Sequence, residues 1–121
     1  MSMHQGSCLC GAVAFELASE PRAVTHCHCR MCQKQHGAAF ATYASVPRAD
    51  LRYTAGEHLL TAYESSPGVI RRFCSVCGAS IEWSGGARYP DWVSIAVAAL
   101  DTPFSPAHTK HVHLDSRACW W

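Results

Sequence analysis

Short runs of apolar and β-branched residues recur along this chain, and glycine, proline or serine separates most runs from the next. Such runs predict β-strands, because branched side chains pack well on a pleated surface and glycine and proline favour turns. The predicted strands cover residues 11–17, 23–27, 39–46, 51–54, 59–64, 69–74, 80–83, 92–97 and 109–114. Amphipathic helical spacing is nearly absent, and a single helical turn is predicted over residues 30–36. The pattern therefore predicts an all-β sandwich or barrel-like fold.

Composition adds the size and the charge of the molecule. The chain has 121 residues, 49% of them hydrophobic, and no linker divides it, so residues 1–121 are predicted to form one domain. A formal net charge of +1 without a basic run gives no support to nucleic acid or an anionic membrane as a partner. The longest apolar stretch, residues 93–100, is too short to span a bilayer, and the first residues lack the apolar region of a signal peptide. We therefore expect a cytoplasmic protein.

The cysteines carry the strongest chemical signal in the sequence. Seven of the eight fall in three tight groups: Cys8 and Cys10; Cys27, Cys29 and Cys32; Cys74 and Cys77. In a reducing compartment, grouped cysteines are more often metal ligands than disulfides. Four thiolates make a closed tetrahedral zinc site, and three leave one coordination position open. The count therefore predicts two zinc ions per chain, one structural and one reactive.

Spacing alone leaves open which cysteines share a metal. The Cys74–Cys77 pair precedes Gly78, which can supply the positive φ of a tight turn that lets both thiolates reach one ion. This pair could join Cys8 and Cys10, which would point to one face if they lie on a strand. It could instead combine with the last two cysteines of the middle group, as in a zinc ribbon.

Histidines close to the middle cysteines could change their chemistry. His26, His28 and His36 could provide a fourth ligand that closes the site, or a base that moves a proton. His111 and His113 would share one face of a strand, where a structural or surface role is preferred. If His111 lay over an open metal position, it could orient a substrate. The remaining cysteine, Cys119, is expected to be a free thiol, with closure of the three-cysteine site as the alternative.

Three motifs occur in an order that resembles a known family. They are G-S-C-L-C-G at residues 6–11, C-H-C-R-M-C at residues 27–32 and R-F-C-S-V-C-G at residues 72–78. Together they resemble the glutathione-dependent formaldehyde-activating enzyme family, also called the GFA or CENP-V domain. The resemblance covers essentially the whole chain. It implies an Mss4-like zinc-binding β fold, in agreement with the strand pattern.

The resemblance also implies an activity and a division of the cysteines. By resemblance, the ligands of the structural zinc are Cys8, Cys10, Cys74 and Cys77, and those of the catalytic zinc are Cys27, Cys29 and Cys32. The family's named activity adds glutathione to formaldehyde and is classed as a carbon–sulfur lyase, so the implied partners are a small thiol and a small aldehyde. Two alternatives remain: a non-catalytic module with two structural zinc ions that binds a protein, and a thiol-redox or metal-sensing role.

Two further sets of residues complete the sequence-based hypotheses. Basic residues could pair with the carboxylates of a glutathione-like thiol: Arg30, Lys34, Arg71, Arg72 and Arg117. The tryptophans are predicted to pack in the core and between strands: Trp83, Trp92, Trp120 and Trp121. The last two would cover either a neighbouring sheet or the partner in a homodimer.

Overall fold

The computed structural model describes residues 3–121 and contains two β-sheets, one short α-helix and five 3-10 helical turns. The smaller sheet has the antiparallel order β1 (His4–Ser7), β2 (Ala14–Leu17), β5 (Leu51–Ala55). The larger sheet has the order β10-β3-β4-β9-β8-β7-β6, in which only the β10–β3 pair is parallel among the described residues. Its strands are β3 (Arg22–Cys27), β4 (Ala41–Pro47), β6 (Leu60–Ser66), β7 (Val69–Cys74), β8 (Ser80–Ser84), β9 (Trp92–Ala96) and β10 (Lys110–Val112).

The predicted all-β class is confirmed, and each predicted run contains or overlaps one strand of the structure. The sequence pattern missed β1, because its residues His4–Ser7 are mostly polar and only pairing with β2 makes them a strand. The predicted strand over residues 11–17 is shorter than expected. A turn closed by the Gly11 N–H donating to the Cys8 carbonyl (3.1 Å) comes before it, and β2 begins only at Ala14.

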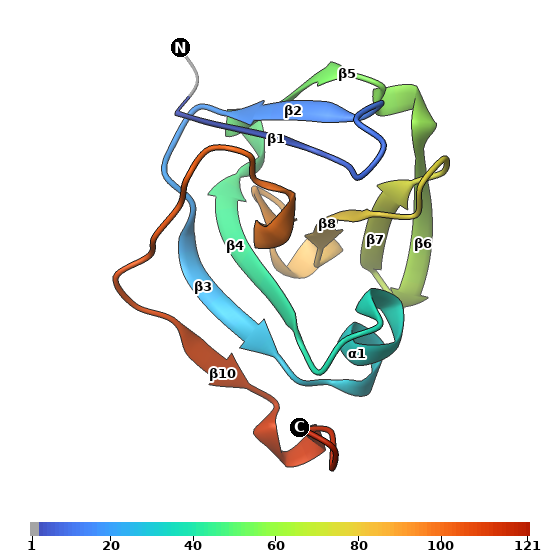
Figure 1. The fold of residues 1–121 in the computed structure, drawn as a ribbon, viewed down its shortest axis with the longest axis vertical. Helices are drawn as coiled ribbons and strands as arrows, with labels where there is room; N and C mark the ends of the chain where they lie inside the picture. The colour runs from blue at the N-terminus through green and yellow to red at the C-terminus, as the bar shows by residue number, and fades with distance from the viewer. Residues whose placement is uncertain (1–2) are drawn as a thin grey trace.

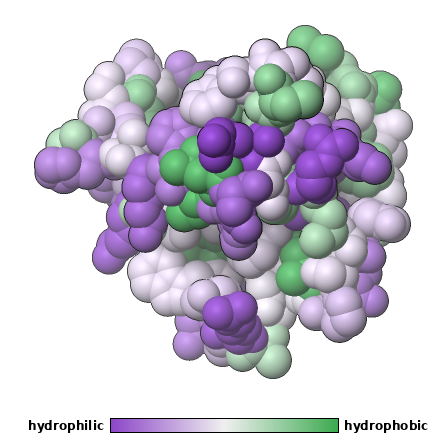
Figure 2. All heavy atoms as spheres, turned by 90° about the horizontal axis from the view of Figure 1, so that it is seen from below, coloured by the Kyte–Doolittle hydropathy of each residue, from purple (hydrophilic) through white to green (hydrophobic). Residues whose placement is uncertain are grey.

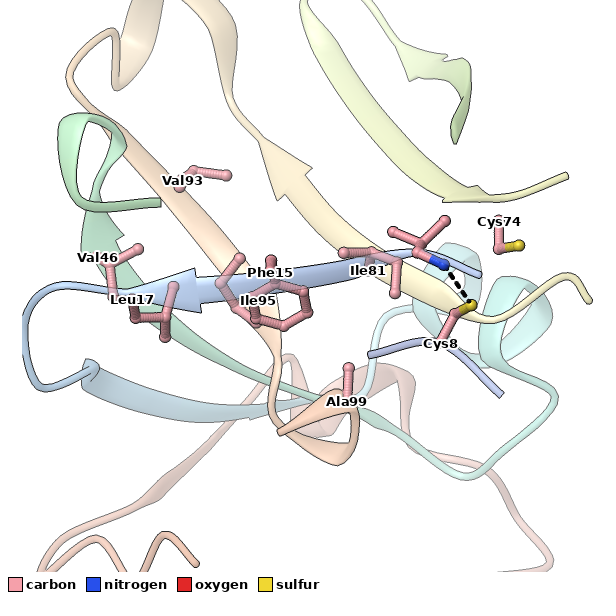
Figure 3. Close-up of a cluster of buried hydrophobic side chains, with 10 residues drawn as sticks. Cys8, Phe15, Leu17, Val46, Cys74, Ile81, Val93, Ile95 and Ala99 are labelled. Atoms are coloured by element: carbon pink, nitrogen blue, oxygen red, sulfur yellow. Dashed lines mark hydrogen bonds between the residues drawn. The ribbon is translucent and has the colours of Figure 1, made fainter. Parts of the chain in front are cut away.

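The core lies between the two sheets, with the smaller sheet across one end of the larger one (Figure 1). Phe15 and Leu17 are two residues apart on β2, so both point to the same face of the smaller sheet. Both are fully buried against apolar residues of the larger sheet: Val46, Ile81, Val93 and Ile95. Figure 3 shows Cys8 and Cys74 at one end of this cluster. The hydrophobic core therefore continues directly into a group of cysteines.

The helix α1 (Arg30–His36) connects β3 to β4 and confirms the predicted helical turn. It begins where the Cys29 sulfur accepts a hydrogen bond from the Cys32 N–H (3.3 Å), which satisfies one of the free N–H groups of the first turn. It ends at Gly37, whose φ of 61° lets its N–H reach the Gln33 carbonyl. A cysteine therefore serves as the helix cap, which fixes its sulfur relative to the helix.

Gly56 follows β5 and packs tightly against the turn before β2. Its φ is +71°, and an added Cβ would overlap the carbonyl oxygen of Ala12. We expect Gly56→Ala to lower the free energy of unfolding by about 3 kcal/mol, because both strain and overlap must be relieved. Gly68→Ala is the matched control, since Gly68 has φ +79° and open space around its Cβ position. Equal denaturation midpoints for the two variants would contradict this expectation.

The molecule's surface is mixed in character on the side seen from below Figure 1. Figure 2 shows small hydrophobic patches there, separated by hydrophilic side chains. Within residues 3–121, none of the helices has the length and apolar character needed to traverse a membrane. The single-domain organisation of residues 1–121, the cytoplasmic location and the homodimer stay predictions.

Candidate metal centres

Four cysteines from two distant parts of the chain meet at one end of the core. These are Cys8, Cys10, Cys74 and Cys77, hereafter the four-cysteine cluster, and their sulfur atoms all lie within 4.8 Å of one another. The Cys8 and Cys10 sulfurs are 3.6 Å apart, and the Cys10 and Cys74 sulfurs are 3.9 Å apart. Thiolates bound tetrahedrally to zinc at about 2.3 Å are separated by about 3.8 Å. The donor set therefore fits a tetrahedral zinc ion.

Two turns, and not a strand, bring these sulfurs together. Cys8 and Cys10 do not lie on a strand, so the condition under which they would share one face is not met: β1 ends at Ser7 and Cys10 lies in the turn that Gly11 closes. The second turn follows β7, where the Gly78 N–H donates to the Cys74 carbonyl (2.8 Å). Gly78 has the predicted positive φ, at 80°.

Backbone N–H groups point at the sulfurs of this cluster. The Val13 N–H donates to Cys8 Sγ (3.3 Å), and the Val76 N–H donates to Cys74 Sγ (3.4 Å). The backbone N–H of Ala79 lowers the pKa of Cys77 to about 6. Such donors favour the thiolate form, which is the form that binds a metal. Cys74 is fully buried, so an ion held here would be structural in character.

The second group, Cys27, Cys29 and Cys32, is hereafter the three-cysteine cluster. Cys27 ends β3, Cys29 caps α1 and Cys32 lies in the first turn of that helix. Their sulfurs lie within 4.8 Å of one another, and across residues 3–121 no histidine, carboxylate or further cysteine joins the group. The structure therefore brings together the same sets of cysteines that the family resemblance groups, and the zinc-ribbon pairing is not formed.

A buried arginine supplies positive charge to the three-cysteine cluster. Arg71 of β7 is 3% exposed, and its guanidinium donates to Cys32 Sγ at 3.6 and 3.8 Å. It also donates to Gln35 and Ser65, and within the described chain no carboxylate pairs with it. A buried charge is stable only when it is compensated. Arg71 therefore places its positive charge beside the thiols of this cluster, where a thiolate would compensate it.

The thiols of the three-cysteine cluster differ in acidity. The neighbouring Cys32 thiol lowers the pKa of Cys27 to about 5, against burial, which raises it. The same interaction with Cys27, together with burial, raises the pKa of Cys32. The interaction between these two thiols therefore favours the thiolate form of Cys27 and the protonated form of Cys32. Metal binding would displace the remaining protons.

Three histidines lie on the opposite face of β3 from Cys27. Successive side chains of a strand alternate between faces, so His26 points away from the cluster. His111 lies opposite His26 in the parallel β10–β3 pair, and its Nδ1 is 2.7 Å from Nε2 of the fully buried His28. The hypothesis that His111 lies over the open metal position is therefore wrong, because the strand register assigns it to the other face.

His36 and His113 have different surroundings. His36 hydrogen-bonds to the Tyr43 hydroxyl (2.8 Å) and joins neither cluster. His113 follows the end of β10, where a φ of 59° turns it out of the strand, so it does not share a face with His111. It lines a cavity of about 300 Å³ that also contains all three cysteines of the cluster, together with Tyr43 and Arg71. The structural or surface role preferred for His113 from the sequence did not include this place beside the cysteines, because a left-handed histidine has no local sequence signal.

The fold separates the five basic residues that could pair with the carboxylates of a glutathione-like thiol. Arg71 and Lys34 line a second cavity of about 340 Å³, with Met31, Gln35, Tyr63 and Ser65. Since Met31 and Arg71 also line the cavity of the three-cysteine cluster, the two cavities adjoin. The other three bond within the protein: Arg72 to Glu82 (3.1 Å), Arg30 to Gln33 (2.6 Å) and Arg117 to the Leu114 carbonyl (2.8 Å). Cys119 is an exposed free thiol outside both clusters.

The fold and the clusters define a small all-β protein with two clusters of cysteine thiols, each of which could hold a metal ion. The family model for glutathione-dependent formaldehyde-activating enzymes matches residues 3–116. The chain belongs to this family, whose name implies an enzymatic activity.

Individual relatives agree with this assignment. A Halomonas elongata protein provisionally named as a glutathione-dependent formaldehyde-activating enzyme is 30% identical over 124 residues, covering 96% of this chain and 78% of that protein. A Colletotrichum graminicola protein with the same provisional name is 27% identical over 94 residues, covering 78% of this chain and 42% of that protein. The crystal structure of a Rhodobacter sphaeroides protein has a TM-score of 0.70 and 26% identity, covering 88% of this chain and 98% of that chain.

Proposed function

We propose that the protein binds two zinc ions, a structural one in the four-cysteine cluster and a reactive one in the three-cysteine cluster. The proposal is supported by the converging sulfurs of both groups and by the family to which the chain belongs. Zinc held by three thiolates would supply an open position at which an incoming thiol gives up its proton. A site of this kind carries net negative charge and suits a soft thiol better than it suits the generation of hydroxide.

We further propose that this cluster joins a glutathione-like thiol to a small aldehyde such as formaldehyde, as a carbon–sulfur lyase-type enzyme. The observation that carries this function is a cluster of only three thiols, open to a cavity that a buried arginine lines. In the reaction the thiol sulfur forms a bond to the carbonyl carbon and the π electrons move to oxygen. The proton released by the thiol ends on that oxygen, so no oxidant or reductant is needed.

Residues of the chain would assist this addition in two ways. Arg71 offsets the negative charge of the thiolates, which favours ionisation of a further thiol in the same cavity. Lys34 lines the adjoining cavity and can pair with a carboxylate of a glutathione-like thiol. Holding thiol and aldehyde together in one cavity would contribute mainly through proximity.

The test measures exchange between glutathione and S-hydroxymethylglutathione in the presence of formaldehyde, by NMR exchange spectroscopy with and without the zinc-loaded protein. We expect the protein to accelerate exchange over the spontaneous reaction, and a chelator that removes the more labile zinc to abolish the acceleration. An exchange rate equal to that without protein, with both metals bound, would contradict the enzyme and favour the non-catalytic binding module.

A further inference from the structure

A third cavity, on the face of the larger sheet that also carries the three-cysteine cluster, is lined mainly by aromatic side chains. It measures about 340 Å³, and we call it the aromatic pocket; its lining includes Arg22, Ser45, Trp83, Tyr89, Trp92 and Ser94. Trp92, for which core or strand packing is predicted, is 36% exposed as the first residue of β9 and lines this pocket, so it does not lie in the core. The proposed reaction of glutathione with formaldehyde leaves this pocket without an occupant.

The strand register joins this pocket to the three-cysteine cluster. Ser45 of β4, Ser94 of β9 and Trp83 of β8 lie opposite one another across three neighbouring strands, so they share one face of the sheet. Ser94 and Trp83 also line the cavity that holds the cysteines. Cys27 pairs with Ala41, and Ser45 lies four residues further along β4, which corresponds to about 13 Å. One elongated ligand could therefore occupy both cavities.

The aromatic pocket is lined mainly by apolar side chains and contains one cation, the guanidinium of Arg22. The Arg22 guanidinium lies 5.4 Å from the centre of the Trp92 ring, and within residues 3–121 it has no carboxylate partner. A β-bulge and the φ of 54° at Ala23 interrupt the strand beside it, and such irregularities redirect neighbouring side chains. Aromatic walls with one free guanidinium match a flat apolar group that ends in a carboxylate.

A peptide fits this pocket poorly. Amide groups placed among aromatic rings would lose hydrogen bonds to water, and the uncharged side-chain partners in the lining are the hydroxyls of two serines and Tyr89 and the indole N–H groups of two tryptophans. The peptide part of a glutathione-like thiol is better matched to the adjoining cavity that Lys34 and Gln35 line. The aromatic pocket is then available to the other reactant.

We propose that the aromatic pocket binds the aryl-carboxylate end of an elongated aldehyde whose carbonyl group reaches the three-cysteine cluster. This inference rests on the proposed function and assigns it a substrate class larger than formaldehyde. The aryl group packs between the aromatic side chains of the pocket, and the carboxylate accepts hydrogen bonds from Arg22. The addition itself is unchanged: carbon and sulfur form a bond, and the thiol proton ends on the carbonyl oxygen.

The pocket is tested first without chemistry, by calorimetric titration of the zinc-loaded protein with para-phenylbenzoate, which has no aldehyde. We expect binding to wild type that is about tenfold weaker in Arg22→Gln, because a charge-assisted hydrogen bond is lost. Trp92→Ala should also weaken binding, and the neutral para-phenylbenzamide should not distinguish Arg22→Gln from wild type. Arg48→Gln removes an exposed arginine outside the pocket and is expected to bind as wild type does. No binding, or equal binding by Arg22→Gln, would overturn the inference.

Turnover then separates the two proposals. The matching aldehyde carries a formyl group at the para position of the outer ring of the same acid. With glutathione, we expect it to have a higher kcat/KM than formaldehyde. Arg22→Gln should lower kcat/KM for this aryl aldehyde more than for formaldehyde. If the acid binds and only formaldehyde is consumed, the pocket is not a substrate pocket and the inference is wrong. If neither aldehyde is consumed, the proposed function fails, and the substrate assignment fails with it even where the acid binds.

Discussion

Replacing Cys29 by serine is expected to remove one of two bound zinc ions and to lower thiol–aldehyde activity by about a hundredfold or more, while the fold is retained. The metal should be lost because a hydroxyl is a much weaker zinc ligand than a thiolate. The fold should survive because Cys29 caps α1 through its side chain, and serine is among the preferred residues at that position. Changing a residue that only hydrogen-bonds to a metal ligand typically lowers activity by about 10- to 100-fold. Removing the ligand itself should therefore cost at least as much.

The measurements are zinc content, circular dichroism and the exchange rate of glutathione with its formaldehyde adduct. Cys119→Ser is the matched control, because Cys119 is an exposed cysteine outside both clusters. It should keep two zinc ions and full activity. A Cys29→Ser protein that retains both metals and wild-type exchange would rule out the three-cysteine cluster as the reactive centre. Loss of folding in the same variant would instead mark this cluster as structural.

Replacing Cys74 by serine should have the largest effect on stability. Cys74 is fully buried, belongs to the hydrophobic core and lies in the four-cysteine cluster. A metal in this cluster would link the turn after β1 to the turn after β7, so its loss would release two segments that are far apart in sequence. We expect the free energy of unfolding to fall by about 4 kcal/mol or more, an exceptional size for one substitution.

Thermal unfolding with and without a strong chelator separates metal loss from the cost of a buried hydroxyl. The chelator should lower the melting temperature of the wild-type protein, because it removes the stabilisation that the metal supplies. The melting temperature of Cys74→Ser should change little in the chelator, because its site already lacks the metal. Cys119→Ser should follow the wild-type curves under both conditions. A wild-type melting temperature that the chelator leaves unchanged would contradict a structural metal in this cluster.

Much of the secondary structure could be read from local sequence. The run at residues 69–74 coincides with β7, and the helical turn at residues 30–36 coincides with α1. Both depend on side-chain shape and on breakers that lie within a few residues. The polar strand β1 could not be recognised in this way, because only its hydrogen bonds to β2 make it a strand. Turn geometry was equally hidden at Cys8 and Cys10, which lie in a chain reversal and not on a strand.

The sequence by itself determined most of the strands, the helix and the close spacing of the cysteines, because β-branched runs, breakers and neighbouring cysteines act over short distances. The tertiary structure decided which groups meet. Pairing of β10 with β3 turned His111 away from the cysteines, and burial of Arg71 against Cys32 joined β7 to α1. The alignment of Ser45, Ser94 and Trp83 likewise depends on strand register, in which a shift of one residue moves every side chain to the opposite face. That register is set by packing between distant segments, and no local stretch of sequence records it.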